Sequence, residues 1–180
     1  MLRIKTVDSR NADDAELRHL YGTAFPVEEQ IPYDELIQLL DVLSIDYRAY
    51  YNDETLVGLT MVMNLTDYNW LWYFAVKENL RGKGYGQEIL SQVLNEYRDG
   101  RPFVIDIESP LQPDAPNPKQ RARRHAFYKR NGLKDTPTSR SYNGVTYTIM
   151  TNSDAPFSQQ DYDSIVDALL SVWKMMPSEE

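Results

Sequence analysis

Apolar positions along this chain follow two spacings, and each spacing predicts a different kind of element. Leu17, Leu20 and Ala24 repeat at the helical interval, and Pro26 follows them as a stop signal. Runs of β-branched and aromatic residues bounded by turn residues predict strands. The sequence predicts helices over residues 13–24, 32–40, 87–97 and about 158–175, another helix that ends before Gly132, and strands over residues 2–7, 46–51, 55–64, 68–76, 103–107, 136–142 and 145–151.

Nothing in the sequence divides these elements into separate units. There is no repeat, low-complexity tract or linker, so residues 1–180 are expected to form a single domain. The C-terminal helix, about 158–175, is expected as an appendage to that domain. Its apolar stripe includes Tyr162, Ile165 and Leu169. This stripe either closes over the core or meets a second subunit in a homodimer.

Composition and charge exclude several classes of function. A net charge of −8 argues against a nucleic-acid partner, because such proteins need a basic face. No stretch has the length of a membrane span, and residues 1–5 lack the apolar core of a signal peptide, which predicts a cytoplasmic protein with no membrane partner. The chain has no cysteine, and His19 and His125 are isolated, so no disulfide and no metal site are expected.

A glycine-rich segment, Arg81-Gly82-Lys83-Gly84-Tyr85-Gly86-Gln87, lies between a predicted strand and a predicted helix. The first N–H groups of such a helix and the positive end of its dipole favour a phosphate or pyrophosphate. Lys83 is not followed by Ser or Thr, which excludes a Walker A loop. A Rossmann fingerprint is excluded because it requires a third glycine within residues 87–89. The alternative is a turn that merely joins strand to helix.

A second segment, Arg123 to Leu133, ends as helices commonly do, because Gly132 follows a basic last turn that carries Phe127-Tyr128. In chain order the sequence has Phe74-Ala75-Val76, then Arg-x-x-Gly-x-Gly over residues 81–86, then Phe-Tyr and Gly-Leu. This order resembles the GNAT superfamily of N-acetyltransferases. The late helix of that family commonly ends in Phe-Tyr and, a few residues later, Gly-Phe. Here Leu133 replaces the usual Phe.

The resemblance implies an α/β fold with a central, mostly antiparallel twisted sheet flanked by helices, and acetyl-CoA as the co-substrate. Family members often carry an asparagine seven residues before the helix tyrosine, but Arg121 occupies that position here, and the nearest asparagine is Asn117. By resemblance, the cofactor-binding residues are Phe74, Ala75, Val76, Arg81, Gly82, Lys83, Gly84, Tyr85, Gly86 and Gln87.

Acyl transfer to an amine needs a base, because an amine with a reference pKa of about 10.4 is mostly protonated at neutral pH. Asp106 and Glu108 alternate onto one face of the strand that begins at Phe103. Glu108 stands at the C-terminal end, where ligands commonly bind. We therefore expect Glu108 to be the catalytic base. The alternative is that these acids pair with neighbouring arginines or cap a loop.

The thiolate of coenzyme A needs an acid, and by resemblance Tyr128 occupies that position. A tyrosine hydroxyl with a reference pKa of about 10 can protonate a thiolate of pKa about 8.5 at modest cost. The alternative is that Tyr128 only packs beside Phe127. The resemblance also implies that the strand over residues 74–76 hydrogen-bonds the pantetheine arm, with one N–H group polarising the thioester oxygen.

Two functions remain as hypotheses. The first is an N-acetyltransferase that moves an acetyl group from acetyl-CoA directly to a primary amine of a small molecule or a peptide. The second is a non-catalytic acyl-CoA-binding or regulatory module of the same fold. The two hypotheses differ at Tyr128 and Glu108, which only the enzyme needs as reactive groups. The sequence identifies neither the acceptor nor the preferred acyl chain.

Overall fold

The computed structural model describes residues 1–173 of the chain. The last two residues of the predicted C-terminal helix, 174 and 175, lie outside the described range. The helices and strands are β1 (Arg3–Val7), α1 (Ala15–Ala24), α2 (Tyr33–Val42), β2 (Ile45–Asn52), β3 (Thr55–Asn64), β4 (Asn69–Val76), α3 (Tyr85–Glu96), β5 (Phe103–Glu108), α4 (Pro118–Arg130), β6 (Lys134–Tyr142), β7 (Val145–Thr151) and α5 (Gln159–Trp173), with 3₁₀ turns at Val27–Glu29 and Glu78–Leu80.

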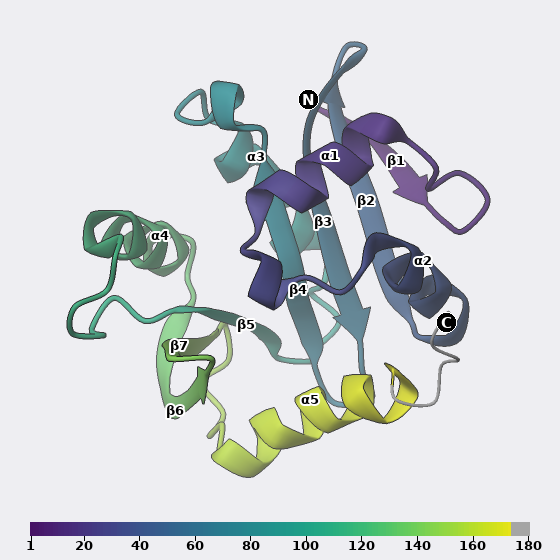
Figure 1. Ribbon diagram of the computed structural model, residues 1–180. Helices are drawn as coiled ribbons and strands as arrows, with labels where there is room; N and C mark the ends of the chain where they lie inside the picture. The colour runs from purple at the N-terminus through teal and green to yellow at the C-terminus, as the bar shows by residue number, and fades with distance from the viewer. Residues whose placement is uncertain (174–180) are drawn as a thin grey trace.

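A seven-stranded sheet forms the centre of the molecule, in the order β1-β2-β3-β4-β5-β7-β6. Neighbouring strands are antiparallel, except that β4 and β5 run parallel. Figure 1 shows α1 and α2 over one face of the sheet, with α5 below them. The expected mixed α/β fold with a mostly antiparallel sheet and an added C-terminal helix is therefore confirmed.

Each face of the sheet has its own hydrophobic core. The core on one face joins buried side chains of α1, α2 and α5, such as Leu17, Leu36 and Ile165, to the sheet. The core on the other face contains Leu90 of α3 and Tyr128 of α4. The apolar stripe of α5 thus packs into the core of its own chain, as one of the two sequence interpretations expected. No helix among residues 1–173 combines the length and apolar character needed to span a membrane.

The element boundaries follow the local signals in most places. The strands predicted over 55–64 and 145–151 are confirmed to the residue. Asn143 and Gly144, with φ of 47° and 78°, form the tight turn between β6 and β7. Helix α3 begins at Tyr85, two residues before the predicted start at 87, because the left-handed Gly84 is its N-cap. The glycine segment therefore includes the first turn of the helix.

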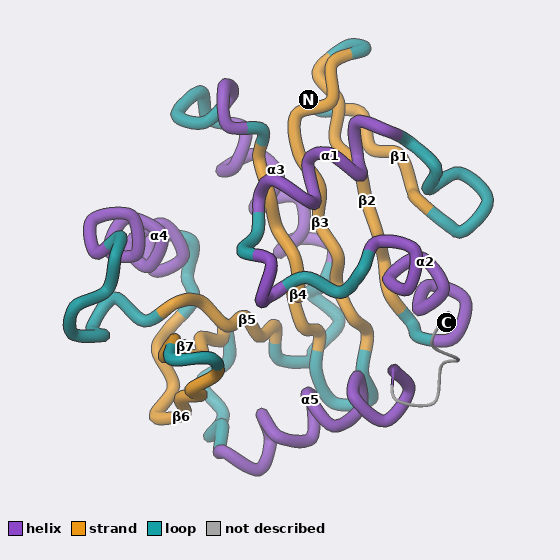
Figure 2. Tube along the Cα trace, in the orientation of Figure 1, coloured by secondary structure: helices purple, strands orange, loops and turns teal. Residues whose placement is uncertain are grey.

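Strands β4 and β5 pair over a short distance and then diverge. Their register covers Asn69 to Leu71 on β4, and Leu71 with Ile105 is the last pair. The adjoining β3–β4 ladder is irregular at the same place, because Met61 pairs with Tyr73 and Val62 with Leu71, so Trp72 is an extra residue. Such a bulge bends the strand and increases its twist. In Figures 1 and 2, β4 continues along the sheet while β5 turns away toward α4.

Helix α5 is attached to β5 through the partly buried carboxylate of Asp106. Asp106 accepts hydrogen bonds from Trp70 Nε1 and from the Tyr162 hydroxyl, both at 2.9 Å. Tyr162 is 1% exposed. Burial raises the pKa of Asp106 above its ordinary value, against the hydrogen bonds from Trp70 and Tyr162, which lower it. Because a partly buried carboxylate needs both donors, α5 stabilises the strand that leads into the candidate site.

We predict that Tyr162→Phe lowers the free energy of unfolding by about 1–3 kcal/mol, because it leaves the partly buried Asp106 with one donor fewer. Urea unfolding followed by circular dichroism measures the change. The matched control is Tyr142→Phe, because Tyr142 is 46% exposed and a surface change of this kind is expected to stay within about 0.5 kcal/mol. Equal stability of the two variants would contradict the role given to Tyr162.

Candidate active site

The glycine segment presents backbone N–H groups at the start of α3. Gly82 and Gly84 have φ of 77° and 89°, in the left-handed region that favours glycine. Gly84 is the N-cap of α3. Because glycine has no side chain, no capping side chain accepts from the first N–H groups of the helix. The first N–H to bond within the helix is that of Glu88, to the Gly84 carbonyl at 3.1 Å. The preceding N–H groups of residues 85–87 have no acceptor among the described residues, which suits an anion such as a phosphate.

The two basic side chains of this segment have different environments, since one is hydrogen-bonded to β4 and the other is exposed. Arg81 donates from Nε to the Val76 carbonyl at 3.2 Å, and so ties the segment to the end of β4. Lys83 is exposed and makes no ion pair within residues 1–173. Gly86 lies on the inner side, where an added Cβ would approach Val76 Cγ2 at 3.7 Å and Phe74 Cζ at 3.9 Å. The predicted cofactor-binding residues of β4 and of the loop therefore lie side by side.

The end of β4 has a free edge toward β5. No residue of β5 pairs with β4 beyond Leu71, whereas on the other side β3 pairs with β4 as far as Val76. An extended chain with amide groups could therefore bind along Phe74, Ala75 and Val76 as an added strand does. This is the arrangement that the sequence predicts for the pantetheine arm. It stays a prediction for this chain.

Tyr128 brings a hydroxyl to this region from the last turn of α4. Its side chain is buried, yet its hydroxyl makes no hydrogen bond to any described residue. Burial raises the pKa of Tyr128 to about 12, and Arg124 acts weakly in the opposite direction. The hydroxyl is therefore protonated at neutral pH, which is the state that an acid needs. Phe127 packs against Tyr128, with ring centroids 5.1 Å apart.

Glu108, the expected base, lies in an ion-pair cluster. Its Oε1 accepts from Arg121 at 2.8 Å and its Oε2 accepts from Arg124 at 2.9 Å. Arg121 is 1% exposed and also donates to Asn117 Oδ1 at 2.7 Å and Gln112 Oε1 at 2.8 Å. The arrangement matches the alternative interpretation, in which the acids of β5 pair with arginines. Guanidinium groups therefore occupy both oxygens of this carboxylate, so neither oxygen is free for an acceptor ammonium.

Arg121 therefore has a structural role at the position where members of the resembled family often carry an asparagine. Its guanidinium joins β5, the start of α4 and the loop between them. A side chain so fully enclosed is not available to a ligand. Asn117, the nearest asparagine, uses its side-chain oxygen to accept from Arg121.

A third carboxylate, Glu29, approaches the same region from the opposite face of the sheet. It ends the 3₁₀ turn between α1 and α2, and Figure 2 shows this short turn in front of β4. Its carbonyl accepts from the Tyr73 hydroxyl at 2.7 Å, and its Oε1 accepts from the Tyr147 hydroxyl. Burial raises the pKa of Glu29 above its ordinary value, although the hydrogen bond from Tyr147 acts to lower it. The sequence analysis missed Glu29, and only its position between Pro26 and Pro32, outside any periodic element, could have drawn attention to it.

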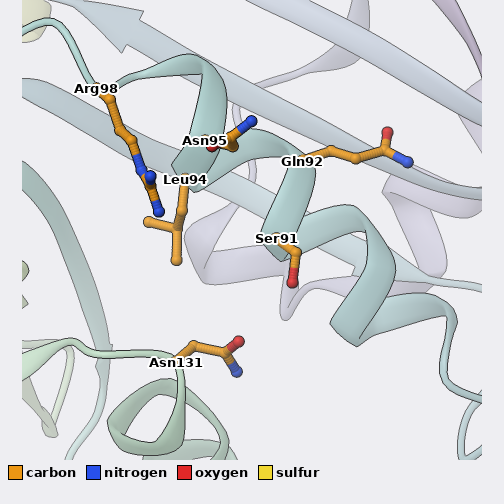
Figure 3. A pocket seen from close by; sticks show the side chains of 6 residues that line it. All are labelled: Ser91, Gln92, Leu94, Asn95, Arg98 and Asn131. Carbon is orange, nitrogen blue, oxygen red and sulfur yellow. The ribbon is translucent and has the colours of Figure 1, made fainter.

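A hollow of about 470 Å³ lies elsewhere, on the outer side of α3 (Figure 3). In Figure 3, Arg98 and Asn131 point into the space between α3 and the end of α4, whereas Gln92 points away. None of the predicted site residues lines this hollow. No group of three or more histidine, aspartate or glutamate side chains within residues 1–173 is arranged to hold a metal ion.

Comparison with known proteins agrees with this geometry. The sequence model of a family described as "Acetyltransferase (GNAT) domain" matches residues 46–134, a segment that contains β4, the glycine segment, β5 and α4. No curated protein sequence matches the chain.

Solved structures share the fold over nearly the whole chain. A protein from Bacteroides thetaiotaomicron, assigned to the GNAT acetyltransferases, is 19% identical with a TM-score of 0.75, covering 97% of this chain and 99% of its own. A Bacillus subtilis acetyltransferase in complex with CoA is 15% identical with a TM-score of 0.60, covering 84% and 97%. A GNAT family acetyltransferase from Elizabethkingia anophelis with acetyl-CoA bound is 15% identical with a TM-score of 0.58, covering 83% and 96%. At these identities the likeness establishes the fold.

We predict that Gly84→Ala weakens acetyl-CoA binding at least about tenfold, a loss of about 1.4 kcal/mol. The added methyl group faces open space at the start of α3, where the phosphates are expected, and it strains the left-handed backbone. Gly100→Ala is the matched control, because Gly100 has a φ of 92° and equally open surroundings, but lies outside the glycine segment. Calorimetric titration measures the dissociation constants. Equal affinity of the two variants would remove Gly84 from the predicted phosphate site.

We also predict that Arg121→Met lowers the free energy of unfolding by about 3 kcal/mol or more, because it leaves buried acceptors of β5 and the following loop without their donor. Arg123→Met, an exposed change on the same helix, is expected to stay within about 0.5 kcal/mol. Denaturant unfolding of both variants measures the difference. A small effect at Arg121 would mean that the ion-pair cluster does not hold the loop.

Proposed function

The chain belongs to the GNAT superfamily of acetyltransferases, and from that premise we propose that it transfers an acetyl group from acetyl-CoA directly to a primary amine of a small molecule or a peptide. The observation that carries the proposal is the divergence of β4 from β5, which leaves the strand edge at Phe74–Val76 open beside the unbonded hydroxyl of Tyr128. The cytoplasmic location and the homodimer stay predictions.

Acetyl-CoA fits the groups that surround this opening. The free N–H groups at the start of α3 suit the pyrophosphate, and Lys83 offers an unpaired positive charge beside them. The open edge of β4 suits the amides of the pantetheine arm, and an N–H of that edge would stabilise the oxyanion of the thioester carbonyl. In this placement the thioester lies between β4 and β5.

The reaction needs one proton removed and one supplied. The acceptor ammonium loses a proton to a base, and its nitrogen lone pair then attacks the thioester carbonyl carbon to form the N–C bond. The resulting intermediate collapses, the C–S bond breaks, and the thiolate takes the Tyr128 proton. The second proton of the nitrogen returns to the Tyr128 phenolate by way of water, so that the net reaction releases one proton. With its pKa raised to about 12, Tyr128 is protonated at neutral pH and holds the proton that the departing thiolate takes.

The competing function is a module that binds acyl-CoA without catalysis. Titration of the purified protein with acetyl-CoA in a calorimeter tests the part that both functions share, and one-to-one binding is expected. Incubation with acetyl-CoA and a library of primary amines, with free thiol as the readout, then separates them. Binding without thiol release from any amine would favour the non-catalytic module, and absence of binding would contradict both functions.

We predict that Tyr128→Phe lowers kcat by about 100-fold or more, because the thiolate then leaves without a positioned acid. The dissociation constant for acetyl-CoA and the free energy of unfolding are expected to change little, since the hydroxyl makes no hydrogen bond to a described residue. Steady-state kinetics and calorimetry on the same preparation measure these quantities. An unchanged kcat would remove Tyr128 as the acid.

A further inference from the structure

We propose that Glu29, rather than Glu108, is the base that binds the acceptor ammonium and takes its proton. This inference rests on the proposed function and assigns one of its catalytic residues. The observation that motivates it is a carboxylate with one oxygen bonded to Tyr147 and the other without a partner among the described residues. Its partners Tyr73 and Tyr147 belong to the core on the face opposite to Tyr128, and Asp106 and Glu108 of β5 influence its charge.

The position of Glu29 is fixed through both its backbone and its side chain. The Tyr73 hydroxyl of β4 donates to the Glu29 carbonyl at 2.7 Å, and the Tyr147 hydroxyl of β7 donates to Oε1. Tyr73 is 4% exposed, so the anchor on the backbone is buried. Oε2 accepts no hydrogen bond from any residue that the structure describes. A carboxylate held in this way presents its second oxygen in a defined direction.

The surroundings of Glu29 suit a proton acceptor. Its side chain is partly buried, and burial is the largest influence on its pKa, which lies above the ordinary value. Glu108 and Asp106 of β5 raise the pKa of Glu29 further, whereas Tyr147 of β7 and Arg124 of α4 lower it. A more basic carboxylate takes a proton from an ammonium group more readily than one with an ordinary pKa.

The two other carboxylates have no free oxygen to offer. Each oxygen of Glu108 accepts from an arginine, and each oxygen of Asp106 accepts from Trp70 or Tyr162. A carboxylate whose two oxygens both accept hydrogen bonds from the protein has no oxygen left to bind the ammonium. Of these three carboxylates, only Glu29 has an oxygen without a hydrogen-bond donor among the described residues.

In the proposed step, Oε2 of Glu29 accepts one N–H proton of the acceptor ammonium, and the N–H bonding pair stays on nitrogen as the lone pair. That lone pair forms the N–C bond to the acetyl carbon, the C–S bond breaks, and the thiolate takes the Tyr128 proton. The second proton of the nitrogen returns to the Tyr128 phenolate by way of water, and Glu29 releases its proton to water. The residue is ionised again for the next turnover, and no further reactant is needed.

The first test is Glu29→Gln, which keeps the shape and the acceptor for Tyr147 but cannot take a proton. With acetyl-CoA and a panel of tyramine, putrescine and a short peptide with a free N-terminus, we expect kcat to fall about 100-fold or more. The dissociation constant for acetyl-CoA is expected to stay within about twofold, because Glu29 lies outside the cofactor segment. Glu54→Gln is the matched control, since the Glu54 side chain is 96% exposed, and its kcat is expected to be unchanged.

The second test is the pH profile, which a merely structural role would not move. The acidic limb of kcat/KM is expected to report the ionisation of Glu29. The Tyr147 hydroxyl stabilises the charged form of Glu29 and lowers its pKa, so Tyr147→Phe is expected to shift this limb to higher pH. Added formate is expected to restore part of the turnover of Glu29→Ala by supplying a carboxylate.

The experiments distinguish a wrong assignment of Glu29 as the base from a wrong proposed function. An active wild-type protein whose Glu29→Gln variant folds, binds acetyl-CoA and keeps its kcat and acidic limb would overturn the assignment alone. A loss of the limb in Glu108→Gln instead would return the role to Glu108. No thiol release by the wild-type protein with any amine of the panel would overturn the proposed function, and the assignment with it.

Discussion

The separation of β4 from β5 is the constraint on which the rest of the site depends. The two strands pair only as far as Leu71 and Ile105, and the β3–β4 ladder has its bulge at Trp72, the next residue of β4. A strand edge inside a sheet leaves backbone groups that need a partner. Here the unpaired edge lies next to the glycine segment that begins α3, so we expect the amide groups and the phosphates of the cofactor to bind at neighbouring places.

The opening also brings together side chains from opposite faces of the sheet. Tyr128 belongs to the core that contains α3 and α4, whereas Tyr73, the anchor of Glu29, belongs to the core under α1, α2 and α5. In a continuous sheet, the backbone and its neighbours would separate these two groups. Because β4 and β5 stop pairing after Leu71 and Ile105, the proposed donor Tyr128 on one side and the proposed acceptor Glu29 on the other could both reach a group held between the strands.

The sequence predicts the parts of this site that depend on local signals. The strands, the glycine segment and the helix that carries Tyr128 have periodicity, turn residues and caps, and their outlines are confirmed. The environment of Glu29 had no such signal, because its contact with Tyr147 joins residues 118 positions apart in the chain. The sequence left two interpretations of Glu108 open, a catalytic base or a partner of neighbouring arginines. Deciding between them required the direction of α4 relative to β5, which the spacing of residues along the chain does not reveal.

The negative net charge of the chain limits how coenzyme A, itself a polyanion, can be bound. With a net charge of −8, the molecule as a whole repels coenzyme A. Of the arginines of α4, Arg121 is buried and Arg124 is paired with Glu108, whereas Arg123 and Arg130 are exposed. We therefore expect attraction to come from local sources, among them the oriented N–H groups at the start of α3 and the exposed charge of Lys83. Fields of this kind act within the first turn of a helix, so we expect the phosphates of acetyl-CoA to be recognised by close contact with the backbone more than by long-range steering.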